Sequence, residues 1–240
     1  MQIPASPSHA PAGAPLKAIS SMATRQLLTE LAQAYEAATG VKLALESVGG
    51  VDAAKRVQAG EVFDIVFLAS DAIEKLLAVG HLAAGSREDL VHSGVAVAVK
   101  EGAVAPDIRS EAAVRAAVLA APTLSYSTGP SGVALAKLFE RWGIAEAIQS
   151  RIVQAPPGVP VGTLVARGEV ALGFQQLSEL IHVPGIRIVG PLPPEIQITT
   201  TFSAGVGVHS KQSAAARALL DYMRSPQAHG AKLRQGMEPA

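Results

Sequence analysis

The chain has 240 residues, of which 49% are hydrophobic and 17% charged, the composition of a folded α/β protein with a sizeable core. Twenty Lys and Arg residues balance twenty Asp and Glu residues, so net charge attracts neither nucleic acid nor an anionic membrane. No apolar run reaches the roughly 18 residues that a membrane-spanning helix needs. The absence of cysteine excludes disulfides, thiolate metal sites, iron–sulfur clusters and a cysteine nucleophile.

Residues 1–15 are predicted to form a loose N-terminal arm, because they contain four prolines and small residues without periodicity. The arm lacks the basic and apolar regions of a secretory signal. Two interpretations stay open: a cytosolic protein with an unstructured start, or a mature exported protein with an added initiator Met. We expect a periplasmic protein, and the cytoplasm is not excluded.

From Leu16 the pattern alternates between strands and helices. The helix predicted at 22–39 has apolar residues at helical spacing and ends at Gly40. Ser70 and Asp71 are predicted to cap a further helix. These units comprise strands at 16–20, 41–45 and 63–69 and helices at 22–39, 52–59 and from 70 onward. Three consecutive βα units predict a parallel, doubly wound sheet.

The rest of the chain repeats this alternation. The segment Ser127–Gly132 is predicted to open a helix that turns Val133, Ala136 and Phe139 inward. A return strand and an amphipathic helix are expected near the C-terminus, followed by a short helix with Pro226 in its first turn. The remaining predicted elements are strands at 94–99, 124–126, 170–174 and 202–208 and helices at 163–166 and 214–223.

Small polar residues gather where the predicted strands end. Open α/β sheets bind ligands beyond the carboxyl ends of their strands, and helix N-termini there favour anions. The strand ends are Ser20–Ser21, Glu46–Gly50, Ser70, Ser127–Gly132 and Gln175–Gln176. Each small residue alone is also explained as a cap or turn residue. Together they predict a hydrogen-bonding anion cradle.

Several segments make the chain similar to the molybdate-binding, type II periplasmic binding proteins. They are Ala18–Arg25, Gln58–Asp71, Ser127–Gly132, Gly168–Gln176 and the ending from Ser225 to Pro239. The resemblance implies an α/β fold of two lobes, each a mixed, mostly parallel sheet flanked by helices, with a ligand cleft between them. It places lobe I at 16–96 plus 203–240 and lobe II at 97–202.

The chain also departs from the molybdate-binding pattern. Ser21 stands at the family's first oxyanion-binding serine, and Ser131 at a position that contributes a backbone amide. However, Val51 stands near the position of the family's second oxyanion-binding serine, and Gln176 stands where molybdate binders usually have a tyrosine. Losing buried donors costs about 1–3 kcal/mol each, so a carboxylate ligand suits the site better than molybdate. The substrate-binding candidates are Ser20, Ser21, Arg25, Gly49, Gly50, Ser70, Ser127, Thr128, Ser131, Gln175 and Gln176.

The first and fifth loops resemble those of the family's aconitate isomerase branch. That resemblance implies a 1,3-proton shift between cis and trans tricarboxylates, which requires no metal, cofactor or covalent nucleophile. The base would be Glu46, with its pKa raised by desolvation, or Tyr126 acting as a proton relay. Arg25 would pair with a substrate carboxylate. Each residue also has an ordinary structural interpretation. Glu46 would then be a buried structural or surface-edge carboxylate, Tyr126 a packing residue and Arg25 a solvated arginine on the helix surface.

Three functions therefore remain open. The first is an isomerase acting on a polycarboxylate. The second is the solute-binding subunit of an ABC importer for molybdate or a related oxyanion, with a permease as its partner. The third is a ligand-sensing domain, which is least favoured because no helix-turn-helix precedes Leu16. In each case we expect a small anionic ligand, no nucleic acid and no membrane insertion.

Overall fold

A computed structural model describes residues 14–155 and 159–240, so most of the predicted arm, residues 1–13, lies outside the described part. The strands are β1 (Leu16–Ser21), β2 (Leu43–Val48), β3 (Ile65–Ala69), β4 (Glu88–Lys100), β5 (Leu124–Tyr126), β6 (Leu172–Gln176), β7 (Ile186–Pro191), β8 (Thr199–Val206) and β9 (Glu238–Pro239). The α-helices are α1 (Arg25–Thr39), α2 (Gly50–Gln58), α3 (Ser70–Ala78), α4 (Glu111–Ala120), α5 (Pro130–Arg141), α6 (Ala145–Ile148), α7 (Val161–Arg167), α8 (Leu177–Leu180), α9 (Ser213–Arg224) and α10 (His229–Arg234). Short 3₁₀ turns are η1 (Met22–Thr24), η2 (Gln149–Arg151), η3 (Pro194–Ile196) and η4 (Pro226–Ala228).

The strands follow the order β2-β1-β3-β8-β4-β6-β5, with β7 and β9 also paired to β4. β1 pairs in parallel with β2 and β3, which confirms the parallel arrangement predicted for the first three βα units. β8 returns antiparallel between β3 and β4. Beyond β4 the described pairing is mainly antiparallel, because β6 and β7 both run against β4 and only β5 joins β6 in parallel.

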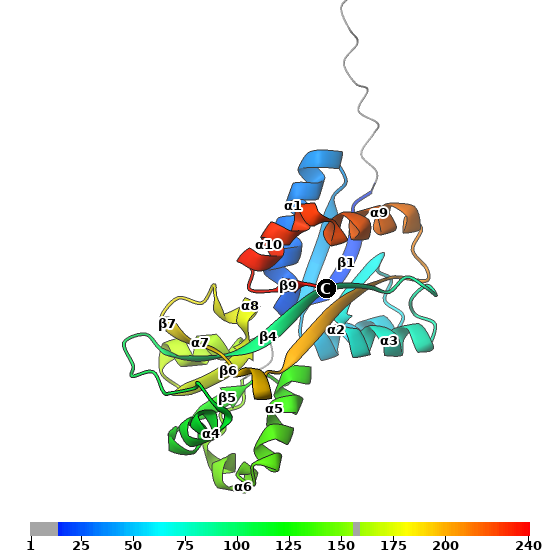
Figure 1. Cartoon of the computed structure of the whole chain (residues 1–240). Coiled ribbons are helices and arrows are strands. Elements are labelled where there is room, and N and C mark those ends of the chain that lie inside the picture. Colours follow the sequence, from blue (N-terminus) through cyan, green and yellow to red (C-terminus); the bar gives the residue numbers. More distant parts are fainter. Residues whose placement is uncertain (1–13, 156–158) are drawn as a thin grey trace, which may run out of the picture.

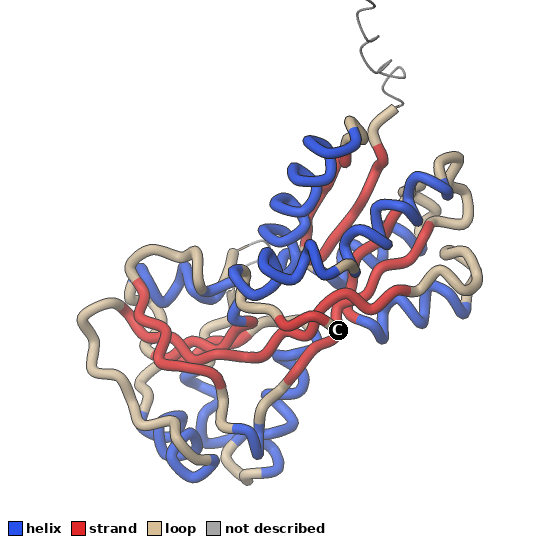
Figure 2. Tube along the Cα trace, turned by 45° about the horizontal axis from the view of Figure 1, so that its top comes forward, coloured by secondary structure: helices blue, strands red, loops and turns tan. Residues whose placement is uncertain are grey.

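The long strand β4 connects two halves of the molecule: a first half with β1, β2, β3 and β8, and a second half with β5, β6 and β7. Figure 2 shows strands continuing through both halves. Residues 88–94 of β4 pair with β8, whereas residues 95–100 pair with β6 and β7. Val95, Val97 and Val99 pack into one core of the second half, and Ala96 and Ala98 into another. This alternation follows from the two-residue period of a strand, so both faces of β4 are covered there.

Helices cover both faces of the sheet in each half. In the first half, α1, α9 and α10 lie on one side and α2 and α3 on the other (Figure 1), each group with its own apolar core. In the second half, α4, α5 and α6 pack into one core, and α7 and α8 contribute to separate cores. The carboxyl ends of β1, β3 and β6 lead directly into helical segments, and those of β2 and β5 reach helices after a short loop, which positions the candidate site.

Several predicted details are wrong. β4 begins at Glu88 instead of Gly94, and α4, α8 and β7 were not predicted. The N-cap of α3 is Ala69, and no side chain caps that helix, so Ser70 and Asp71 do not have the expected role. In α5, Val133 is 53% exposed, because Ser131 faces inward and sets a helical phase that buries Leu135, Leu138 and Phe139.

Candidate functional site

The end of β1 places two buried serines beside the start of α2. The Ser20 hydroxyl donates to the backbone oxygen of Ser21 at 3.1 Å and lies 2.8 Å from the hydroxyl of Ser47 on β2. The Ser21 hydroxyl is buried and has no hydrogen-bond partner among the residues that the structure describes. A Cβ atom at Gly50 would lie 3.5 Å from that of Ser21, so the start of α2 is within contact distance. This orphan hydroxyl is a candidate ligand donor.

Among the described residues, α2, α3 and α5 follow strands and begin without a side-chain cap. Gly49 is the N-cap of α2 and Gly50 its first residue; α3 begins at the partly buried Ser70, and α5 follows Gly129. Their first backbone N–H groups have no partner within the helix. N–H groups and helix dipoles of this kind favour an anion, and the anion cradle predicted from the sequence stays a prediction.

The loop after β5 brings two serine hydroxyls together. Ser127 Oγ lies 3.0 Å from Ser131 Oγ, whereas Thr128 is exposed. Gly132 is required here, because a Cβ atom at this position would lie only 1.5 Å from the backbone oxygen of Ser127. Because glycine has no Cβ atom, the backbone of Ser127 can lie close to the first turn of α5.

The two glutamines at the end of β6 have different surroundings. Gln175 accepts a hydrogen bond from the Gly162 backbone N–H at 3.1 Å and donates to Glu179 at 3.0 Å. The Gln176 amide is best satisfied with its nitrogen donating to Ser93 and its oxygen accepting from Thr200 at 2.9 Å. Both glutamines are buried. Gln176 therefore ties β6 to β4 and β8, where the two halves meet.

Arg25 begins α1 and has an exposed side chain. No ion pair involves it among the residues that the structure describes. Its guanidinium is therefore available to a carboxylate.

Glu46 does not have the raised pKa that was expected of a base. It is exposed and forms a two-pronged ion pair with Arg56, at 2.5 and 2.9 Å, and Arg56 also binds Glu61. The hydrogen bonds from Arg56 lower the pKa of the Glu46 carboxyl, outweighing desolvation. The expectation fails because Glu46 is exposed and paired with Arg56, so its ionised form is favoured.

Tyr126 is a packing residue of the second half. Its ring meets Phe139 edge-on at 5.7 Å, and Phe139 in turn contacts Phe174. Burial, and secondarily the Glu140 carboxylate, raises the pKa of the Tyr126 hydroxyl above its ordinary value. Tyr126 therefore stays protonated at neutral pH and is suited to donating a hydrogen bond more than to accepting a proton.

The structure adds two residues that the sequence analysis missed, both on α8. Burial raises the pKa of the Glu179 carboxyl from 4.5 to about 7, opposed in part by the hydrogen bond from Gln175. The neighbouring Ser178 hydroxyl is buried, and no described residue forms a hydrogen bond with it. The sequence signal was the short spacing from Gln176 to Glu179, which places the carboxyl one helical turn beyond the strand end.

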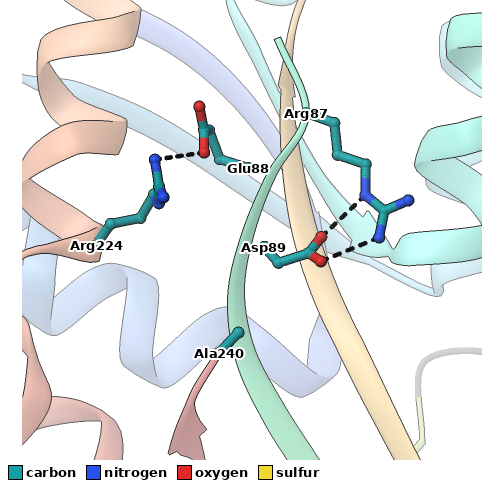
Figure 3. A pocket seen from close by; sticks show the side chains of 5 residues that line it. All are labelled: Arg87, Glu88, Asp89, Arg224 and Ala240. Atoms are coloured by element: carbon teal, nitrogen blue, oxygen red, sulfur yellow. Dashed lines mark hydrogen bonds and ion pairs between the residues drawn. The ribbon is translucent and has the colours of Figure 1, made fainter. Parts of the chain in front are cut away.

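Two cavities lie away from these residues. One of about 340 Å³ is lined by Arg87, Glu88, Asp89, Arg224 and Ala240 (Figure 3). Its charges are already paired, Arg224 with Glu88 and Arg87 with Asp89. Another of about 130 Å³ lies beside Phe63, His81 and His209. Within residues 14–155 and 159–240, no three His, Cys, Asp or Glu side chains form a group able to hold a metal ion.

The architecture is that of a type II periplasmic binding protein, as its structural relatives show. The chain belongs to the bacterial extracellular solute-binding protein family, which it matches over residues 16–238. It is 41% identical over 230 residues to an aconitate isomerase from Pseudomonas sp, covering 93% of this chain and 87% of that protein. It is 28% identical over 208 residues to the molybdate-binding protein ModA of Azotobacter vinelandii, covering 84% and 81%.

Among solved structures, the periplasmic molybdate-binding protein of Azotobacter vinelandii superposes with a TM-score of 0.77 at 21% identity. The superposition covers 92% of this chain and 98% of that one. In the described part of the chain, no helix combines the length and apolar character needed to span a membrane.

Proposed function

We propose that this protein interconverts cis- and trans-aconitate by a 1,3-proton shift. The observation that carries the proposal is its 41% identity to an aconitate isomerase along almost the whole chain. Identity to the molybdate-binding relative is 28%, and the resemblance to molybdate binders places Val51 near a position where they have a serine hydroxyl.

The site supports a tricarboxylate ligand. The uncapped starts of α2 at Gly50 and of α3 at Ser70 offer N–H groups, and α5 offers those that follow Pro130, which has none itself. The Ser21 hydroxyl offers an orphan donor. Arg25 supplies a cation without a competing ion pair among the described residues. Such donors hold carboxylates and stabilise the negative charge that develops as a C–H bond breaks.

Closure of two lobes would bring these groups together. We propose lobe I at 16–96 plus 203–240 and lobe II at 97–202, with the candidate residues converging on the cleft between them. This division follows the change of pairing partners along β4. The family's extracellular role favours the periplasm as the protein's location. Closure would exclude water and strengthen each polar interaction with the substrate.

The reaction moves one proton and one double bond. A base removes a proton from the CH₂ group, and the electron pair of that C–H bond spreads through the allyl system toward a carboxylate. A proton then adds to the former vinyl carbon, so the double bond shifts to the former CH₂–C bond. Rotation about that single bond before the proton leaves decides which isomer forms. Atoms and charge balance without an oxidant or reductant.

The test is to follow EDTA-treated protein with cis-aconitate in D₂O by proton NMR. We expect the trans isomer to accumulate, with deuterium entering the exchanged carbon. Internal return of the proton would reduce that label without preventing conversion. Tight calorimetric binding of molybdate without any conversion would overturn the proposal and favour an importer subunit that works with an ABC permease.

A further inference from the structure

Glu179 is held in one orientation by a short chain of hydrogen bonds. The Gly162 backbone N–H donates to Gln175 Oε1 at 3.1 Å, which fixes which end of the Gln175 amide faces α7. The opposite end, Nε2, donates to Glu179 Oε1 at 3.0 Å. Gln175 and Gly162 are buried, so this arrangement is protected from competing water. One carboxylate oxygen of Glu179 is thereby anchored, and Oε2 has no protein hydrogen bond among the described residues.

The surroundings of Glu179 are nearly free of charge. α8 packs against β6, which has no titratable side chain, and against η1, whose residues are Met, Ala and Thr. It meets β4 at Ala96 and Ala98, in the core that includes Leu180. The nearest titratable residue along the chain, His182, is engaged with Gln235 at 2.6 Å. Burial therefore dominates the carboxyl's behaviour and raises its pKa to about 7.

Two unexplained hydroxyls lie in or next to this contact between α8 and η1. Ser178 is part of α8, and Ser21 is the residue directly before η1, so a segment that follows β1 in the first half meets the residues just after β6 in the second. Ser21 and Ser178 are each more than nine-tenths buried, and neither hydroxyl has a partner within residues 14–155 and 159–240. Buried polar groups are normally paired, so an orphan on α8 and another directly before η1 point to a ligand that supplies the missing acceptors.

We propose that Glu179 is the proton-transfer residue of this site, positioned by Gln175. The inference rests on the proposed isomerase function. Glu179 would accept the proton from the substrate CH₂ group on its free oxygen and return it to the former vinyl carbon, ending each cycle ionised as it began. A carboxyl that titrates near neutrality serves both steps, because neither protonation state is strongly disfavoured.

The experiment compares E179Q with E169Q, a control that removes an exposed carboxylate in the same half of the molecule. We expect E179Q to lower kcat at least about 100-fold, with trans-aconitate affinity by calorimetry changed only a few-fold. E169Q should match the wild type. Urea unfolding checks that each variant is folded. Wild-type activity retained by folded E179Q would overturn the role of Glu179 alone, whereas an inactive wild type would overturn the proposed isomerase itself.

A pH profile separates catalysis from structural support. In the wild type, kcat/KM should rise through a limb near pH 7 as Glu179 ionises. The hydrogen bond from Gln175 favours the ionised form, so Gln175→Met should move this limb to higher pH. The proposal is contradicted if the pH profile of the wild type has no limb near neutrality, or if that limb lies at the same pH in Gln175→Met. Both outcomes can be measured even if E179Q is too unstable to assay.

Discussion

Replacing Glu179 with Gln should make the protein more stable at alkaline pH. The carboxyl has a pKa of about 7 in the folded protein against 4.5 ordinarily. Below pH 4.5 both states are protonated and the group has no effect on folding free energy. As pH rises toward 7 the unfolded chain ionises first, so stability falls, and above pH 7 the cost is constant. At about 1.4 kcal/mol per pKa unit it amounts to about 3 kcal/mol, reduced by the remaining exposure of Glu179.

The measurement is urea unfolding of the wild type and Glu179→Gln from pH 4 to pH 9. Gln retains an oxygen that can accept from Gln175, so any packing change should be independent of pH. We expect the stability difference to grow with pH in favour of the variant and to level off above pH 7. Glu169→Gln should show no such trend, because its carboxylate is exposed. A difference that does not vary with pH would refute the burial argument.

Three further outcomes are expected. Arg25→Ala should raise KM by about 10- to 150-fold, the equivalent of about 1.5–3 kcal/mol for a charged hydrogen bond. Arg217→Ala, on the exposed face of α9, is the control and should leave KM unchanged. Equal KM values for the two variants would show that Arg25 is a solvated surface residue that does not bind the substrate. Gly132→Ala should lower the free energy of unfolding by more than about 1 kcal/mol, because its methyl group meets the Ser127 carbonyl. Gly129→Ala is its control, since the nearest atom there is 3.9 Å away, and equal urea midpoints would disprove the close approach. By carbon NMR, the Glu46 carboxyl should titrate below 4.5 and move upward in Arg56→Gln; an unchanged titration would show that the ion pair is absent in solution.

The sequence by itself determined the order of most elements and the positions of the strand-end residues. Hydrophobic periodicity and glycine stops are local signals, and they located β1, β3 and α9 within about two residues. Local signals also marked Ser21 and Ser127–Gly132, because small polar residues at a strand end follow from chain direction alone. They failed for the first part of β4, whose pairing with β8 depends on residues more than a hundred positions away.

Only the tertiary structure decided which carboxylate has an unusual pKa. Glu46 and Glu179 both stand close to strand ends, and sequence favoured Glu46. The difference between their pKa values depends on residues that folding brings close. Arg56 on α2 pairs with Glu46 and favours its ionised form. Glu179 on α8 is packed against β4, β6 and η1, and its pKa is raised by burial. Desolvation and charge pairing act through space over a few ångströms, and their balance is fixed only when the chain has folded.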